Sequence, residues 1–227
     1  MDNDNDGNLH EDNTSSAASP NEGEMWLAKW LSVLQSIREN DPDTTSLLEN
    51  GDYSNMINMT MTVEDWVQLG RDISSNTHLE TFSLYDGILD DHKLSLLFRE
   101  LTRSSSINYM RLNNNGLSAA GVGSILPFLQ HANSLIELNI SCNNIQSEGF
   151  NSLLRALSES SIETLYCNDC GIQSIEIDSD YFPKHLEILN LCDNMINADG
   201  CRGLAKLLQG EILIYYIYIS STTTSTT

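Results

Sequence analysis

Residues 135–145 carry the sequence LIELNISCNNI, and this stretch decides the fold. Leu or Ile stands at its first, fourth, sixth and eleventh positions, and Asn143 stands at the ninth. The alternation of apolar and polar residues in its first half predicts a β-strand. The polar residues that follow predict a turn directly after that strand.

The same arrangement recurs four more times. Successive copies begin at nearly constant spacing, and the step to the last copy is the shortest. Five copies in register indicate an internal repeat, whose units stack on their neighbours. The other four copies are residues 79–89 (LETFSLYDGIL), 107–117 (INYMRLNNNGL), 162–172 (IETLYCNDCGI) and 186–196 (LEILNLCDNMI).

Between the copies, the pattern changes to helical spacing. Gly121, Gly149 and Gly200 each lie four residues after the last apolar position, and apolar residues three or four apart follow them. Each unit is therefore expected to be a strand, a turn and a helix. The unit that starts at Ile162 has no clear helix pattern, and Pro127 should kink or shorten the helix that contains it.

The repeat fits L-x-x-L-x-L-x-x-N/C-x-L and so resembles the leucine-rich repeats. Units of this length that combine a strand with a helix resemble the ribonuclease-inhibitor-like type. The resemblance covers roughly residues 61–210. It implies an α/β solenoid shaped as a horseshoe, with parallel strands on the concave face and helices on the convex face.

Five segments are expected along the chain. The first is acidic and disordered, because residues 1–24 hold seven acids and no Lys or Arg. The second is an amphipathic helix with Trp26 and Trp30, which caps the solenoid or binds a partner. We assign residues 1–23 to the disordered acidic tail, 24–40 to the helix, 41–60 to a linker or degraded repeat, 61–219 to the leucine-rich-repeat domain and 220–227 to a disordered tail.

The end of the repeat domain is expected to be a last strand. Leu213 follows Leu186 at the same spacing at which Ile162 follows Leu135, and this sets the expected register of the strand. The ninth-position Asn and a following helix are missing, so the edge is expected to be uncapped. The same absence also fits a chain that is truncated relative to its relatives.

The ninth position of the repeat is expected to hold the turns together. The chain bends there and leaves backbone groups that no strand satisfies, and a buried Asn amide both donates and accepts hydrogen bonds. Loss of one such residue should cost roughly 1–3 kcal/mol. The residues of this ladder are Asn115, Asn143, Cys170 and Asn194.

Positions three, five, seven and eight should leave the strands on the concave face, where a protein partner would bind. Tyr and Arg are common anchors of protein interfaces, and the acids favour a basic partner. The alternative is a strand face that is merely solvated. The expected contact residues are Tyr85, Asp86, Tyr109, Arg111, Asn113, Glu137, Asn139, Tyr166, Asn168, Asp169, Asn190 and Asp193.

The charge balance bounds the kind of partner. The net charge is −21, from 11 Lys and Arg against 32 Asp and Glu, which argues against nucleic acid and anionic membranes. No secretory signal and no apolar run of membrane-spanning length is present. We therefore expect a cytoplasmic monomer in which the five cysteines are free thiols.

No motif in the sequence indicates catalysis. Cys167 and Cys170 form a C-x-x-C, but no second ligand pair accompanies them, and both occupy structural positions of the repeat. Residues 2–13 imitate the first half of a calcium loop, yet Asn13 stands where the bidentate Glu belongs. We predict no enzyme, no cofactor and no metal, and weak calcium binding by the tail stays an alternative.

The sequence therefore predicts a non-enzymatic protein–protein interaction module. Two rivals follow from the resemblance, since similar repeats occur in GTPase-activating proteins and in receptor-type sensors. The first rival is a regulator of a small GTPase, and the second is a fragment of such a sensor.

Overall fold

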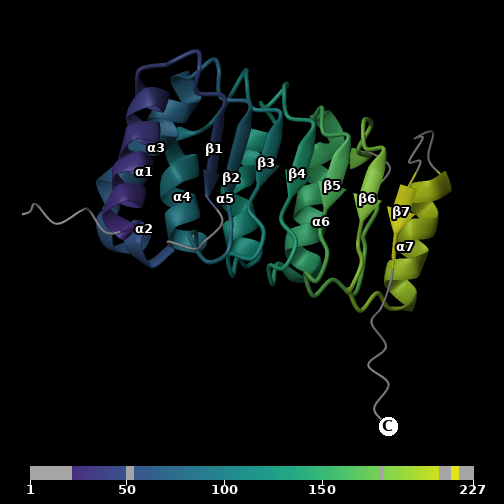
Figure 1. Ribbon diagram of the computed structural model, residues 1–227. Helices are drawn as coiled ribbons and strands as arrows, with labels where there is room; N and C mark the ends of the chain where they lie inside the picture. The colour runs from purple at the N-terminus through teal and green to yellow at the C-terminus, as the bar shows by residue number, and fades with distance from the viewer. Residues whose placement is uncertain (1–21, 50–53, 179–180, 210–215, 220–227) are drawn as a thin grey trace, which may run out of the picture.

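A computed structural model describes residues 22–49, 54–178, 181–209 and 216–219. In this part of the chain, seven parallel strands form one sheet, and each strand pairs with the next one along the sequence (Figure 1). The strands are Ser46–Glu49 (β1), Thr81–Leu84 (β2), Tyr109–Arg111 (β3), Glu137–Asn139 (β4), Thr164–Tyr166 (β5), Ile188–Asn190 (β6) and Tyr216–Tyr218 (β7).

The helices form a second layer behind the sheet (Figure 1). The mixed α/β arrangement with a parallel sheet agrees with the fold class expected from the repeat, while the curvature of a horseshoe stays a prediction. The helices are Glu22–Arg38 (α1), Ser54–Thr60 (α2), Val63–Ser75 (α3), Asp91–Glu100 (α4), Ala119–Leu129 (α5), Gln146–Ala156 (α6) and Ala198–Gln209 (α7), with a 3-10 turn at Leu157–Glu159 (η1). None of these helices is both long and apolar enough to cross a membrane.

The sheet register repeats the sequence register. The fourth positions Met110, Leu138, Leu165 and Leu189 align across neighbouring strands and are fully buried against the helices. Burial of each such side chain stabilises the fold by roughly 1.5–3 kcal/mol. The residues on either side of them point to the opposite face of the sheet, because side chains alternate along a strand.

Residues 41–60 contain an additional strand. β1 pairs with β2, and Leu47 takes the buried position beside Phe82. These two residues are further apart in the sequence than the matching positions of any two successive repeats, since both α2 and α3 lie between the strands. A search at the period of the other repeats therefore misses this strand.

The helix α1 begins at Glu22, two residues earlier than expected, and packs on α3. Its buried side chains are Trp30 and Ile37. Arg38 forms a salt bridge with Asp72 of α3, with 3.0 Å between Nε and Oδ2. The remaining residues of the expected acidic tail and all of residues 220–227 lie outside the described residues.

The short unit between β5 and β6 has no α-helix in its described residues. Its extended segment lies directly against α7, where a Cβ atom on Gly203 would be 2.0 Å from the Ile175 carbonyl oxygen. A Cβ atom on Gly200 would likewise be 2.5 Å from the Gln173 carbonyl oxygen. Glycine at both positions allows backbone to pack on backbone. Pro127 lies near the end of α5, which stops two residues later.

The register expected for the last strand is wrong by one residue. Ile217, and not Tyr216, pairs with the buried Leu189. Because a shift of one residue exchanges the two faces of a strand, Tyr216 and Tyr218 lie on the open side of the sheet, where they are 57% and 48% exposed. This register keeps both phenol groups in water and turns an Ile toward the core.

Candidate protein-binding face

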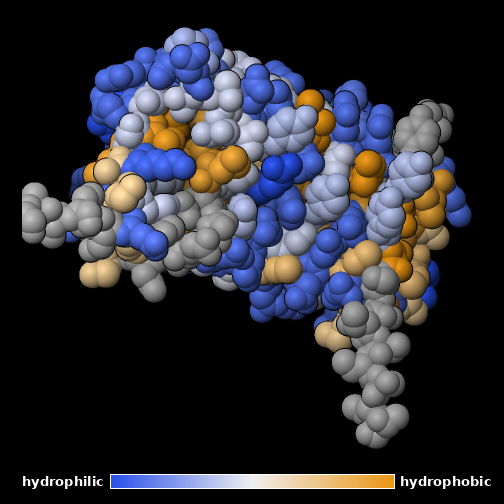
Figure 2. All heavy atoms as spheres, in the orientation of Figure 1, coloured by the Kyte–Doolittle hydropathy of each residue, from blue (hydrophilic) through white to orange (hydrophobic). Residues whose placement is uncertain are grey.

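The third and fifth positions of the repeats point away from the helices, and we call the surface they form the strand face. Figure 2 shows this face as a mixture of hydrophilic and hydrophobic side chains. Residues of one row are neighbours across the sheet, as the strand register shows. One row is Thr81, Tyr109, Glu137, Thr164, Ile188 and Tyr216, and the other is Ser83, Arg111, Asn139, Tyr166, Asn190 and Tyr218.

Arg111 is held at the centre of the strand face by two neighbours. Its Nε and Nη2 atoms both lie 2.9 Å from Oε1 of Glu137. Its guanidinium carbon also lies 5.8 Å from the centre of the Tyr109 ring, within range of a cation–π contact. The arginine side chain is still 39% exposed. A partner would therefore meet a cation whose conformation is already fixed.

Tyr166 lies between two asparagines that are held in the same way. Oδ1 of Asn139 accepts a hydrogen bond from the Ser141 N–H at 3.0 Å, and Oδ1 of Asn190 accepts one from the Cys192 N–H at 3.2 Å. Neither amide nitrogen donates to another described residue. The two NH₂ groups are thus oriented by their own turns and remain for water or a partner.

The eighth positions form a row at the ends of the strands, and all five residues have positive φ angles of 48–60°. Asn and Asp tolerate this left-handed conformation better than most residues. The need for a positive φ angle at every eighth position therefore explains why three of the five residues are aspartates, which lie together at this edge. The row consists of Asp86, Asn114, Cys142, Asp169 and Asp193.

The electrostatic effect of this row is visible at Cys142. Partial burial raises the pKa of its thiol, and the carboxylates of Asp169, Asp86 and Asp193 raise it further. The three carboxylates therefore make the surroundings of Cys142 electrically negative, and a cationic group would be favoured there. Arg111 is the only Lys or Arg among the described residues of the strand face and this row.

The raised pKa predicts slow chemistry at this thiol. At pH 8, Cys142 should hold less thiolate than an ordinary cysteine, so iodoacetamide should alkylate it slowly although it is exposed. Its pH–rate profile should have a midpoint above the ordinary value for a thiol. Asp169→Asn should lower the pKa and accelerate alkylation, measured by mass spectrometry of the labelled peptide. An unchanged profile in Asp169→Asn would show that the carboxylate does not act on the thiol.

The other sequence-predicted contact residues lie at the ends of the strands. Tyr85 and Asn113 are half-buried. The backbone N–H of Asn168 donates to Oγ of Ser141, and its buried side-chain oxygen has no hydrogen-bond partner among the described residues. The prediction omitted Thr81, Ser83, Tyr216 and Tyr218. The longest spacing between successive repeats, counted on from Ile188 and Asn190 of β6, leads to Tyr216 and Tyr218. This spacing would therefore have identified both tyrosines.

The ladder residues lie below the strand face. Nδ2 of Asn143 donates to the carbonyl oxygens of Leu112 and Ile140 at 2.9 and 2.8 Å, and to a third at 3.2 Å. Its Oδ1 atom accepts from the N–H groups of Asn115 and Leu117 at 2.9 and 3.0 Å. This one side chain thus joins the backbones of two repeats. Asn115 and Asn194 make the same kind of contacts.

Cys170 performs only half of this role. Its Sγ atom lies 3.5 and 3.4 Å from the carbonyl oxygens of Ile140 and Asn168, as a donor. A thiol is a weak acceptor, so the Ile145 N–H bonds to the Asn143 carbonyl oxygen instead. The next residue, Gln146, has a φ of 59°, and α6 starts without a side-chain cap. Cys167, the other cysteine of the C-x-x-C, lies in the core, and burial raises its pKa.

No group of three or more His, Cys, Asp or Glu side chains in the described part of the chain is arranged to hold a metal ion. The five cysteines are free thiols.

Comparison with known proteins gives partial matches. No family model matches the chain. Human leiomodin-2 is 30% identical over 106 residues, which are 47% of this chain and 18% of that protein. Mouse NACHT, LRR and PYD domains-containing protein 14 is 27% identical over 144 residues, 60% of this chain and 14% of that protein. The chain thus spans less than a fifth of the length of these curated relatives.

One solved structure has a comparable fold. Its title is "Leiomodin-1 Actin-Binding Site 2 (ABS2)", with a TM-score of 0.50 and 20% identity, covering 60% of this chain and 76% of that chain. At this identity the likeness concerns the fold alone. In its in-register repeat and its parallel sheet with helices, the chain resembles leucine-rich-repeat proteins.

Proposed function

We propose that this chain is a non-enzymatic protein-interaction module whose partner binds the strand face. The observation that carries the proposal is the group of Tyr109, Arg111 and Glu137, with Tyr166 beside it. An arginine and two tyrosines are exposed or half-buried there. The arginine is fixed by its salt bridge with Glu137 and by its cation–π contact with the Tyr109 ring. Such preorganised side chains bind with little loss of conformational entropy.

The chemistry of the strand ends suggests a basic partner. Asp86, Asp169 and Asp193 are all exposed, and they lie in one row beside the strand face. Opposite charge on a partner would accelerate association and fix its orientation. We place this activity in the cytoplasm and with a monomeric chain.

Actin is the first partner to test. The solved structure with a comparable fold is titled as an actin-binding site, and a related protein, human leiomodin-2, aligns over 106 residues. We also assign the repeats to the ribonuclease-inhibitor-like type, because most units combine one strand with one helix over a nearly constant length.

The test compares two matched double variants of the full chain. Arg111→Ala with Tyr166→Ala removes the strand-face group. Arg155→Ala with Tyr181→Ala removes an exposed tyrosine and an arginine that is likewise paired with a glutamate, both away from this face. Affinity purification from cell extract and sedimentation with purified actin measure binding. The strand-face variant should lose about tenfold or more in affinity, and the control should bind as the intact chain does.

The two parts of the proposal can fail separately. Equal binding by both variants to the same partner set would remove the strand face as the binding surface. If the chain does not sediment with actin, but the strand-face variant loses other partners, actin is excluded as the partner and the strand face is retained as the binding surface.

A further inference from the structure

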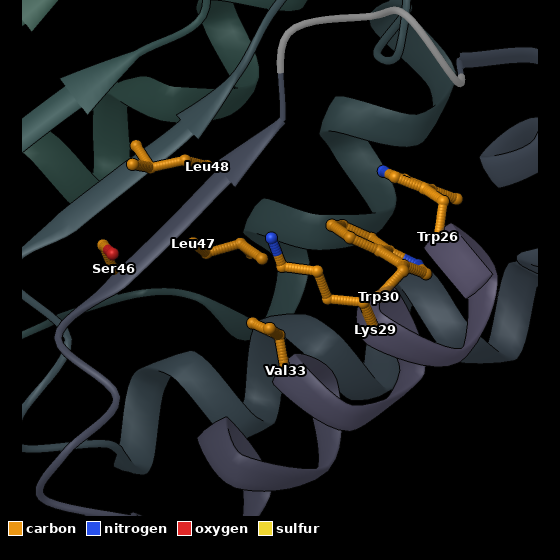
Figure 3. Close-up of a pocket in the computed structure, with 7 residues that line it drawn as sticks. All are labelled: Trp26, Lys29, Trp30, Val33, Ser46, Leu47 and Leu48. Atoms are coloured by element: carbon orange, nitrogen blue, oxygen red, sulfur yellow. The ribbon is translucent and has the colours of Figure 1, made fainter. Parts of the chain in front are cut away.

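A second surface lies at the first edge of the sheet, between α1 and β1. A pocket with a volume of about 250 Å³ opens there. We call it the β1 groove, and Figure 3 shows its side chains. Its lining residues are Trp26, Lys29, Trp30 and Val33 of α1 with Ser46, Leu47 and Leu48 of β1.

The groove is apolar and partly open. Trp26 and Trp30 stack with 5.9 Å between ring centres and an angle of 10°. In Figure 3, Trp30 and Val33 extend from α1 toward Leu47. Leu48, whose side chain points to the face of β1 opposite Leu47, is 59% exposed. Figure 2 shows hydrophobic side chains where α1 and β1 lie in Figure 1, bordered by hydrophilic ones.

The backbone of β1 is also available on this side, because β1 is the edge strand among the described residues. The carbonyl oxygen of Thr45 accepts hydrogen bonds from Glu80 and Thr81, so Thr45 faces β2. Backbone groups alternate in direction along a parallel strand, and those of Ser46 and Leu48 therefore point to the open edge. An exposed edge of this kind can take an additional strand.

The charge of the groove indicates what that strand carries. Eight of the eleven Lys and Arg side chains form a salt bridge with a described acid. Lys29 forms none with a described residue, although the chain has 32 acids. Among the described residues that line the pocket, it is the one that carries a charge. A carboxylate on the bound segment could therefore form a salt bridge with Lys29, next to the apolar side chains of the pocket.

We propose that the β1 groove binds an extended peptide segment of another protein, with a large apolar side chain and, two residues away on the same side of the strand, an Asp or Glu. The segment adds to β1 as an eighth strand. Its residue opposite Leu47 points to the same side as Leu47 and enters the pocket against Trp30. Pockets for small molecules usually have about 300–1,000 Å³, so the smaller volume fits one side chain better than a free ligand.

The experiment titrates the ¹⁵N-labelled full chain with the peptide acetyl-TVFTEV-amide, in which Phe and Glu lie on the same side of the strand. Shifts should concentrate in α1 and β1 residues. The dissociation constant should rise at least about fivefold for the peptide TVATEV, for TVFTKV and for the variant Lys29→Glu. Arg103→Glu changes another cation that has no salt bridge with a described residue, and it should leave the affinity unchanged. No shifts at millimolar peptide, or an equal loss in Arg103→Glu, would overturn the proposal.

Strand addition is tested separately through the backbone of the peptide. N-methylation of every second amide should abolish binding in one register and be tolerated in the other, because only one set of N–H groups faces β1. Ser46→Pro removes a donor at the open edge and should weaken binding at least about fivefold. Equal tolerance of both methylated peptides would overturn the proposed strand pairing.

Two other occupants of the groove are distinguishable. Replacement of the five acids before residue 22 by amides would raise the peptide affinity if this chain's own first residues occupied the groove. A dimer in sedimentation that Lys29→Glu dissociates would indicate a second copy. Either result would overturn the assignment to another protein.

Discussion

Asn143→Ala should lower the free energy of unfolding by about 3 kcal/mol, which is the upper end of the cost of an unsatisfied buried group. The side chain is 1% exposed and makes five hydrogen bonds to the backbones of two repeats. Alanine would leave those backbone groups without a partner in a place from which water is excluded. Urea denaturation, followed by circular dichroism, measures the change.

Two further variants show whether the ladder is the cause. Asn133→Ala changes an exposed asparagine and should alter the stability by less than about 0.5 kcal/mol. Cys170→Asn supplies the acceptor that the thiol lacks, and it should add about 1 kcal/mol. A loss below about 0.5 kcal/mol in Asn143→Ala would contradict the role of the amide.

Gly203→Ala should destabilise the chain by about 2 kcal/mol. The new Cβ atom would lie 2.0 Å from the Ile175 carbonyl oxygen and 2.8 Å from its carbon, which are backbone atoms. Overpacking of this kind costs roughly 1–3 kcal/mol, and the better helix propensity of alanine returns only about 1 kcal/mol. Thermal and urea unfolding of the variant measure the net effect.

The matched control for this change is Gly123→Ala in α5. No atom lies within 4 Å of a Cβ built at Gly123. The same substitution should there stabilise the chain by up to about 1 kcal/mol, because only the propensity difference remains. Equal effects at the two glycines would show that the contact with Ile175 is unimportant.

Much of the fold could be predicted from the sequence because the repeat ties each position to one environment. Met110, Leu138 and Leu165 are buried where the period places them. β1 could not be found in this way, because two helices separate Leu47 from Phe82 and no copy of the motif surrounds it. The register of β7 was wrong because both Tyr and Ile suit a strand, and only packing decides which one faces the core.

The candidate site could be predicted in part. The strand positions of Tyr109, Arg111 and Tyr166 follow from the repeat alone. The salt bridge between Arg111 and Glu137 does not, since it joins two units and depends on side-chain conformation. The pocket between α1 and β1 also lacked a signal, because it is formed by the two elements outside the regular repeat.

The short unit between β5 and β6 has no α-helix among its described residues, and this weakens the packing between the repeats on either side of it. The helices α4, α5 and α6 pack against one another in sequence, but α7 does not pack on α6 in this way. Its connection to the rest runs through the β5–β6 pairing and the backbone at Gln173 and Ile175. Repeat proteins gain their cooperativity from contacts between neighbours. We therefore expect the last block, from β6 onward, to open before the remaining array does.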